Sequence, residues 1–154
     1  MRPAHRLDGR LVALVALGGM VGTTGRYLLS EALPSHGGWP VPTLAANVLG
    51  SFLLGALLEA LLRRGGESPR GRAVRLGVGT GVLGGFTTFS SLALELERLL
   101  AHDQVLTAAS YAVASLTCGL LACLLGVAVA ARHDKRRGAR GRDSADRPVS
   151  QGAR

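Results

Sequence analysis

Four long stretches of the chain are almost free of charged residues, and charged or turn-forming residues separate them. The stretches cover about residues 11–33, 43–62, 76–94 and 106–131. Because an α-helix rises about 1.5 Å per residue, about 20 residues cross a hydrocarbon core of about 30 Å. A water-soluble bundle would show polar residues at a helical period on one face of each helix, and these stretches do not. The pattern predicts an all-α membrane protein with four transmembrane helices.

The third stretch contains a segment that a uniform lipid-facing helix cannot accommodate. Residues 84–91 read GGFTTFSS, with two adjacent glycines and four hydroxyl side chains. Glycine loosens a helix, and each hydroxyl needs a partner in a medium without water. Backbone that breaks at membrane depth is tolerated only where it is buried in protein or lines a cavity. We therefore predict that the third helix is broken near its middle, and that the break is the functional centre of a small channel or transporter.

The chain divides into three regions by composition. Residues 1–10 are polar and basic, residues 11–131 hold the spans, and residues 132–154 are rich in Arg, Gly, Asp and Ser. We place the spans at about 11–33, 43–62, 76–99 and 106–131. The last region has almost no large apolar residue, so it is expected to be a disordered tail. The basic start and apolar run also resemble a signal peptide, but the run resumes after Arg26 and three more spans follow, which favours an uncleaved first span.

The formal net charge is +8, and the basic residues gather on one side of the predicted spans. The N-terminal segment has three Lys and Arg residues, the loop between the second and third spans has five, and the tail has eight, which is sixteen of the eighteen in the chain. Because basic loops stay in the cytoplasm, we expect a multi-pass protein of the cell membrane with both termini cytoplasmic. Topology and contact with anionic membrane lipid explain these charges, so nucleic acid is not an expected partner.

Two polar side chains inside the first two spans each allow a structural and a functional interpretation. Arginine at the membrane centre costs about 2.5–3.5 kcal/mol on insertion scales. Arg26 is therefore either an interfacial anchor or a basic group that faces a vestibule and attracts anions. The amide of Asn47 either bonds to another helix, as buried amides in membranes commonly do, or donates to an anion.

The third and fourth spans carry hydroxyl groups that also allow two interpretations. A hydroxyl can bond back to the carbonyl of its own helix, or it can replace water around an anion. Free carbonyls at a helix break can hold a small cation, and the positive ring edges of Phe86 or Phe89 can face an anion. In the fourth span Tyr111, Ser115 and Gly119 share one helix face. This row fits either a polar track along a pore or hydrogen bonds between helices.

The motifs of all four spans resemble those of the Fluc (CrcB-type) fluoride channels. The matching segments are residues 18–27 (GGMVGTTGRY), 43–52 (TLAANVLGSF) and 81–91 (GVLGGFTTFSS), together with Glu95, Tyr111 and Ser115. The resemblance implies passive export of fluoride from the cytoplasm, which relieves fluoride toxicity, through a dimer of antiparallel subunits with two pores. It also implies a structural Na⁺ ion at the centre of the dimer.

The same resemblance implies roles for individual residues. It implies that Asn47 donates to fluoride, that Phe89 presents a ring edge, and that backbone carbonyls of Gly84 and Thr87 bind the Na⁺. The residues that it places on the fluoride pathway are Arg26, Asn47, Phe89, Ser91, Tyr111 and Ser115.

Two features depart from the family pattern. The family typically has a second phenylalanine where this chain has Leu92, and leucine has no positive edge to offer an anion. The one-sided charge is unexpected as well, because a homodimer of antiparallel subunits needs one sequence that inserts in both orientations. We hypothesise that this chain inserts one way and pairs with a related chain of opposite charge bias. The alternative is that the basic tail only inflates the count and a homodimer forms.

Other functions fit the sequence less well. A proton-coupled drug exporter needs a membrane-embedded carboxylate, and Glu31, Glu59 and Glu95 lie toward the ends of spans. A non-transporting partner protein would not need the dense polar cluster in the third span. No nucleophile with an adjacent base and no phosphate-binding loop is recognisable, so we do not expect an enzyme.

Overall fold

The computed structural model describes residues 8–33, 39–66 and 68–145, with side chains described as far as His133. Over these residues the chain forms helices connected by short turns. The elements are α1 (Gly9–Ala32), α2 (Val41–Leu62), α3 (Pro69–Val74), the π-helix η1 (Arg75–Leu83), α4 (Gly84–Phe86), α5 (Phe89–Ala101) and α6 (Val105–Ala145).

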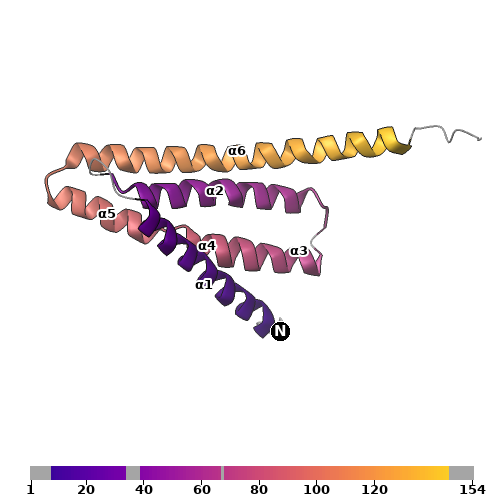
Figure 1. The fold of residues 1–154 in the computed structure, drawn as a ribbon, viewed down its shortest axis with the longest axis horizontal. Helices are drawn as coiled ribbons and strands as arrows, with labels where there is room; N and C mark the ends of the chain where they lie inside the picture. Colours follow the sequence, from indigo (N-terminus) through magenta and orange to yellow (C-terminus); the bar gives the residue numbers. More distant parts are fainter. Residues whose placement is uncertain (1–7, 34–38, 67, 146–154) are drawn as a thin grey trace, which may run out of the picture.

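Three of the described helices are long and apolar enough to cross a membrane. They are α1, α2 and the Val105–His133 part of α6. The elements from α3 to α5 follow one another along a fourth rod, which is interrupted (Figure 1). In Figure 1, α2 and α6 run side by side and α1 crosses the other helices obliquely. These observations confirm the predicted fold class, an all-α membrane protein whose third spanning segment is broken.

The interruption lies at Thr87 and Thr88, just after the paired glycines. Both residues have extended backbone, with φ/ψ of −78°/155° at Thr87 and −150°/122° at Thr88. Extended backbone suits a β-branched residue. The Thr88 hydroxyl also accepts the Ser91 amide at 3.1 Å and so caps the start of α5. The break therefore falls inside the predicted segment, but the threonines make it, since the glycines remain helical in α4.

Glycines bring α1 close to the broken rod. A methyl group at Gly18 would overlap the carbonyl oxygen of Gly77, and a methyl group at Gly22 would overlap that of Val82. Small residues allow such close approach between helices in membranes. The facing segment η1 is wound as a π-helix, a rare form that occurs frequently at functional sites. This contact sets the position of the break relative to the polar residues of α1.

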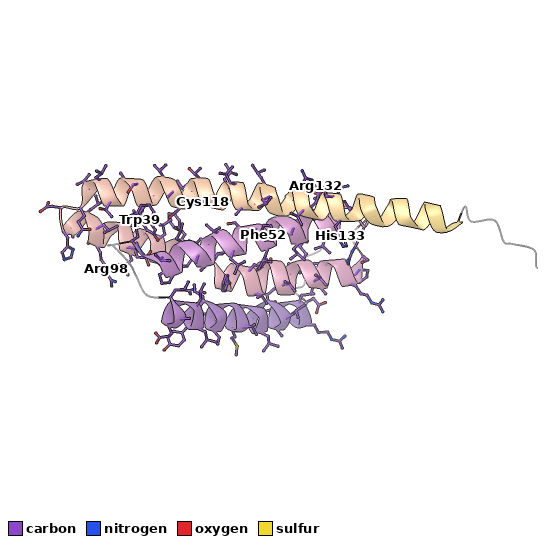
Figure 2. All side chains as sticks on the ribbon, turned by 45° about the horizontal axis from the view of Figure 1, so that its top comes forward. Trp39, Phe52, Arg98, Cys118, Arg132 and His133 are labelled. Carbon is purple, nitrogen blue, oxygen red and sulfur yellow. The ribbon has the colours of Figure 1, made fainter. Side chains whose placement is uncertain are left out.

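The basic segments lie at one end of the molecule. The start of α1, the α2–α3 loop and the far part of α6 share this end, whereas the α5–α6 turn lies at the other (Figure 1). Figure 2 places Trp39 and Arg98 at the second end, and Arg132 and His133 toward the first. The spans thus alternate in direction, as the charge pattern requires.

The C-terminal region differs from the expected tail. Helix α6 continues to Ala145, beyond the predicted boundary at residue 131. Residues 132–145 are mostly Ala, Arg, Lys, Asp and Gly, of which Ala, Arg and Lys favour helix. The next helix-breaking proline is Pro148. Composition that excludes a buried core does not exclude a helix. Residues 146–154 of the predicted tail, and residues 1–7 of the predicted N-terminal segment, lie outside the described residues.

Candidate functional site

Asn47 holds the backbone of the break from the neighbouring helix α2. Its Nδ2 donates to the Thr88 carbonyl at 2.9 Å, and its Oδ1 accepts from the Thr88 amide at 2.8 Å. These two backbone groups lose their helical partners where the rod is interrupted. The side-chain amide has two N–H donors, so one remains after the clamp is made. Asn47 therefore bonds to another helix, as one interpretation of the sequence proposed, and keeps one N–H for another partner.

A groove of about 360 Å³ opens beside this clamp. We call it the central groove. Residues of α2, the break, α5 and α6 line it, including Asn47, Ser51, Thr88, Phe89, Leu92, Ser115 and Gly119. Ser115 is 6% exposed and its hydroxyl lies toward that of Tyr111, one turn earlier, but it makes no hydrogen bond within 3.5 Å of any described residue. A buried hydroxyl without a partner costs about 1–3 kcal/mol, so the groove presents an unused donor beside the Asn47 amide.

Two apolar side chains of α5 in the wall of the central groove differ in their exposure. The ring of Phe89 is 77% exposed, whereas Leu92, one turn later, is buried inside the subunit. A large exposed aromatic ring beside polar groups marks a surface that another molecule or lipid must cover. The ring of Phe89 thus lines the groove, as the family resemblance implies for a residue of the fluoride pathway. Leu92, which replaces the second phenylalanine of the family pattern, lines the same wall.

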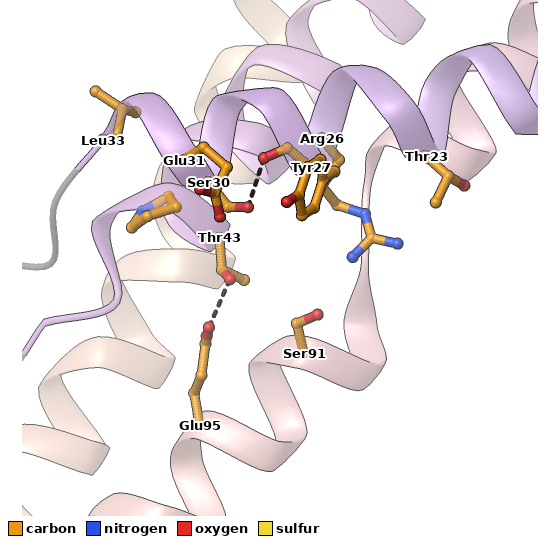
Figure 3. Close-up of a pocket in the computed structure, with 10 residues that line it drawn as sticks. Thr23, Arg26, Tyr27, Ser30, Glu31, Leu33, Thr43, Ser91 and Glu95 are labelled. Carbon is orange, nitrogen blue, oxygen red and sulfur yellow. Dashed lines mark hydrogen bonds between the residues drawn. The ribbon is translucent and has the colours of Figure 1, made fainter.

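A second cavity of about 670 Å³ lies between α1, the start of α2 and α5 (Figure 3). We call it the arginine cavity. Its lining includes Thr23, Arg26, Tyr27, Glu31, Ser91 and Glu95. Arg26 Nε and the Thr23 hydroxyl both donate to the Gly85 carbonyl, each at a long 3.4 Å. The remaining guanidinium donors of Arg26 point into the cavity (Figure 3). A positive group therefore faces both the broken helix and a polar space.

Glu95 ties three elements together at this cavity. Its carboxylate accepts from the Thr43 hydroxyl at 2.6 Å and from the Tyr111 hydroxyl at 2.7 Å. The Tyr111 ring is completely buried and meets the Trp39 ring edge-on at 5.8 Å. Sequence reasoning gave Glu95 no role. The available signal was its position one helical turn after Ser91, which places both on one face of α5.

The structure divides the predicted fluoride-pathway residues between the two cavities. Asn47, Phe89 and Ser115 line the central groove, whereas Arg26 and Ser91 line the arginine cavity. Tyr111 lines neither, because its hydroxyl is directed to Glu95 although the residue shares a helix face with Ser115. The Thr88 hydroxyl lies at the junction, since it contacts the hydroxyls of Ser90 and Ser91 at 3.1 Å.

The break also changes the hydrogen bonds of the backbone around it. The amide and hydroxyl of Thr87 both donate to the Leu83 carbonyl at 3.0 Å. In a continuous helix the Thr88 amide would bond to the Gly84 carbonyl, but it donates to Asn47 instead. Within the described residues no group of three or more His, Cys, Asp or Glu side chains could hold a metal ion. Backbone carbonyls freed at a helix break are groups that can coordinate a small cation such as Na⁺.

The fold and the two cavities define a multi-pass α-helical membrane protein with an interrupted polar span. Residues 13–127 match the family model described as CrcB-like protein, Camphor Resistance (CrcB). The chain belongs to this CrcB-like family, which confirms the resemblance found in the sequence.

Several curated relatives match over most of their length. A protein of Leifsonia xyli subsp. xyli, named fluoride-specific ion channel FluC 2, is 46% identical over 88% of this chain and 93% of its own. FluC 1 of Cutibacterium acnes is 45% identical over 75% of this chain and 82% of its own. FluC of Rhizobium meliloti is 40% identical over 77% of this chain and 94% of its own. These relatives are named as channels, which confirms that the chain is not an enzyme.

Proposed function

We propose that this protein is a subunit of a fluoride-specific channel that lets fluoride leave the cytoplasm passively. The buried hydroxyl of Ser115, which has no partner among the described residues, carries the proposal. It shares the central groove with the spare N–H of Asn47 and the exposed ring of Phe89. Fluoride is small and strongly hydrated, so a pore must replace its water with donors and positive ring edges. The names of the relatives support the same ion.

The other pathway residues complete this picture. Arg26 would attract the anion into the arginine cavity, and Ser91 would pass it toward the break. Tyr111, bonded to Glu95, would hold the wall between that cavity and the Ser115 face of α6. Export down the gradient would keep the cytoplasmic concentration of fluoride below toxic levels.

The functional unit that we propose is a dimer of antiparallel subunits with two pores. The central groove is formed by a single chain and leaves Phe89 largely exposed, so a second subunit would cover it. The break carbonyls of Gly84 and Thr87 would bind one structural Na⁺ at the centre of this dimer. Their fit to Na⁺ rests on the helix break, which directs the Thr88 amide away from Gly84.

We further propose that the second subunit is a related chain. We place the protein in the cell membrane. The basic residues at one end favour a single orientation there, with both termini in the cytoplasm. The numbered names FluC 1 and FluC 2 among the relatives indicate that some organisms hold more than one such chain. A partner with the intact phenylalanine pair would supply the ring that Leu92 lacks.

Fluoride efflux from liposomes tests the function. Ser115→Ala in the assembled channel should lower efflux at least tenfold, because the groove loses its unused donor. Ser110→Ala is the matched control: Ser110 lies on the same helix, is exposed, and donates to the Thr107 carbonyl at 3.0 Å. A fluoride-selective electrode measures the rate, and chloride efflux measures selectivity.

The control variant should retain wild-type efflux within twofold, and chloride should stay inside the vesicles. Equal efflux from the Ser115→Ala and wild-type channels would remove the assignment of the central groove as the pore. Vesicles that remain tight to fluoride with a dimeric wild-type channel would remove the proposed function itself.

A further inference from the structure

A third hollow lies at the basic end of the molecule, apart from the central groove and the arginine cavity. It has a volume of about 650 Å³ and forms where α2 ends, the chain turns, and α3 begins. We call it the basic groove. Its lining includes Leu58, Leu62, Val74, Arg64, Arg70 and Arg75. Apolar walls and guanidinium groups thus surround one space.

No acidic residue is among the described residues that line this groove. Its turn also contains Glu67, which lies outside the described residues. The guanidinium groups of Arg64 and Arg70 make no hydrogen bond or ion pair with any part of the chain that the structure describes. Their neighbour Arg63 does, because its Nε donates to Glu59 Oε1 at 2.6 Å, one turn earlier on α2. As far as the described residues go, the guanidinium groups of Arg64 and Arg70 are left to an anion from outside.

The position of the groove limits what that anion can be. Helix α2 is long enough to cross the membrane and ends at Leu62, so the groove lies where hydrocarbon gives way to headgroups. Leu58 and Leu62 are exposed, and the groove continues their apolar surface. An occupant that satisfies the whole groove needs a negative head and an apolar body. Basic pockets between helices on the cytoplasmic side of membranes are known to bind anionic headgroups.

We propose that the basic groove binds an anionic phospholipid. Its phosphate would lie between Arg64 and Arg70, because guanidinium groups pair with phosphate through two parallel hydrogen bonds. An acyl chain would follow Leu58, Leu62 and Val74. The cavity volume falls within the range of about 300–1,000 Å³ that is usual for small-molecule sites. The basic C-terminal region of this chain is a poor occupant, since its charge has the same sign.

This site is independent of fluoride conduction, so its test uses binding. The full-length protein, in the oligomeric form that it takes in the membrane, is titrated with phosphatidylglycerol and examined by native mass spectrometry. The Arg64→Gln/Arg70→Gln double variant should bind phosphatidylglycerol at least tenfold more weakly than the wild type. The matched control is Arg63→Gln/Arg132→Gln, which removes the same charge from the same end of the molecule but outside the groove. It should bind within twofold of the wild type.

Two further measurements on the wild type separate the possible ligands. Phosphatidylcholine should bind at least tenfold more weakly than phosphatidylglycerol, and soluble glycerophosphoglycerol should not compete. Equal loss in both double variants would mean diffuse attraction to the membrane and would overturn the proposal. Equal binding of both lipids, or competition by the soluble headgroup at equal concentration, would overturn it as well. These two outcomes need no variant, so they decide the question even if the substitutions impair folding.

Discussion

Asn47 shows how one side chain can make a helix break possible at membrane depth. Its amide replaces the two helical hydrogen bonds that Thr88 loses, with distances of 2.9 and 2.8 Å. Unsatisfied backbone groups cost several kcal/mol in hydrocarbon, so the break needs such a clamp. The same amide keeps one N–H toward the central groove. The residue that holds the break therefore has a donor left for the conducting role that we propose.

Removal of this amide should lower stability as well as conduction. Asn47→Ala leaves the Thr88 amide and carbonyl without their partners, which should cost about 1–3 kcal/mol of folding stability. Thermal unfolding of the assembled channel in detergent, followed by circular dichroism, measures this loss.

The matched control for this change is Ser51→Ala. Ser51 lies one turn later on α2 and lines the same groove. Unlike Asn47, it makes no hydrogen bond to the described backbone of the break. Ser51→Ala should unfold within about a degree of the wild type. Loss of one half-buried hydroxyl that does not hold the break has little effect on stability. An unchanged unfolding temperature in Asn47→Ala would contradict the clamp.

At the scale of elements, the broken rod is positioned by its contact with α1. The π-helix η1 and the first turn of α4 carry the glycines that face α1, and Phe86 lies next to Gly25. Interfaces of this kind in membranes depend on close packing, because lipid offers no hydrophobic driving force between helices. The position of the break, and with it both cavities, follows from this packing.

A single methyl group should disrupt this contact. In Gly22→Ala the new methyl would overlap the Val82 carbonyl oxygen and lie 2.8 Å from the Phe86 amide nitrogen, both backbone atoms that cannot rotate away. Overpacking typically costs about 1–3 kcal/mol. We expect a marked loss of folded protein after detergent extraction, measured by size-exclusion chromatography.

Gly19→Ala provides the control on the same helix. The nearest atom to its methyl group would be the Gly81 carbonyl oxygen at 4.0 Å, an ordinary contact. This variant should elute as the wild type does. Similar yields of folded protein from Gly22→Ala and Gly19→Ala would show that the α1–η1 contact is looser than the structure indicates.

The break itself should respond to sodium. If the carbonyls of Gly84 and Thr87 bind Na⁺, replacing it with N-methylglucamine at constant ionic strength should lower the unfolding temperature of the dimer. An ion that is present at a hundred times its dissociation constant stabilises the folded protein by about 2.7 kcal/mol. A thermal melt in Na⁺, K⁺ and N-methylglucamine chloride measures this effect, and identical curves in all three salts would rule out the site.

The whole molecule has one strongly basic end. The start of α1, the α2–α3 loop and the far part of α6 gather there, although they are distant in sequence (Figure 1). Positive charge near span ends sets orientation, so nearly all copies should insert the same way. An antiparallel dimer then requires a second chain whose charge favours the opposite orientation.

Co-expression tests this requirement. A fluorescent protein fused to the C-terminus should be cytoplasmic in every copy, because the basic end stays inside. Expressed alone, the chain should give less than a tenth of the fluoride efflux that it gives with a related chain of opposite charge bias. Protease protection of the fusion in sealed vesicles measures orientation. Full efflux from the chain alone, with the fusion on both sides of the membrane, would establish a homodimer.

The amino-acid sequence by itself determined the spanning segments, the common end of the basic loops and the approximate place of the break. Each of these follows from composition along a single segment: apolar length, positive charge, or glycine next to hydroxyl groups. The motifs of the spans were also sufficient to identify the CrcB-like family.

Only the tertiary structure decided how these residues are used. It separates Arg26 and Ser91 from Asn47, Phe89 and Ser115, and it directs Tyr111 to Glu95 rather than to a groove. The basic groove likewise combines the end of α2 with α3 across a turn. The physical reason is that a hydroxyl, amide or guanidinium group in a membrane takes its role from the partner that packing brings within about 3 Å, and sequence spacing does not fix that partner across helices.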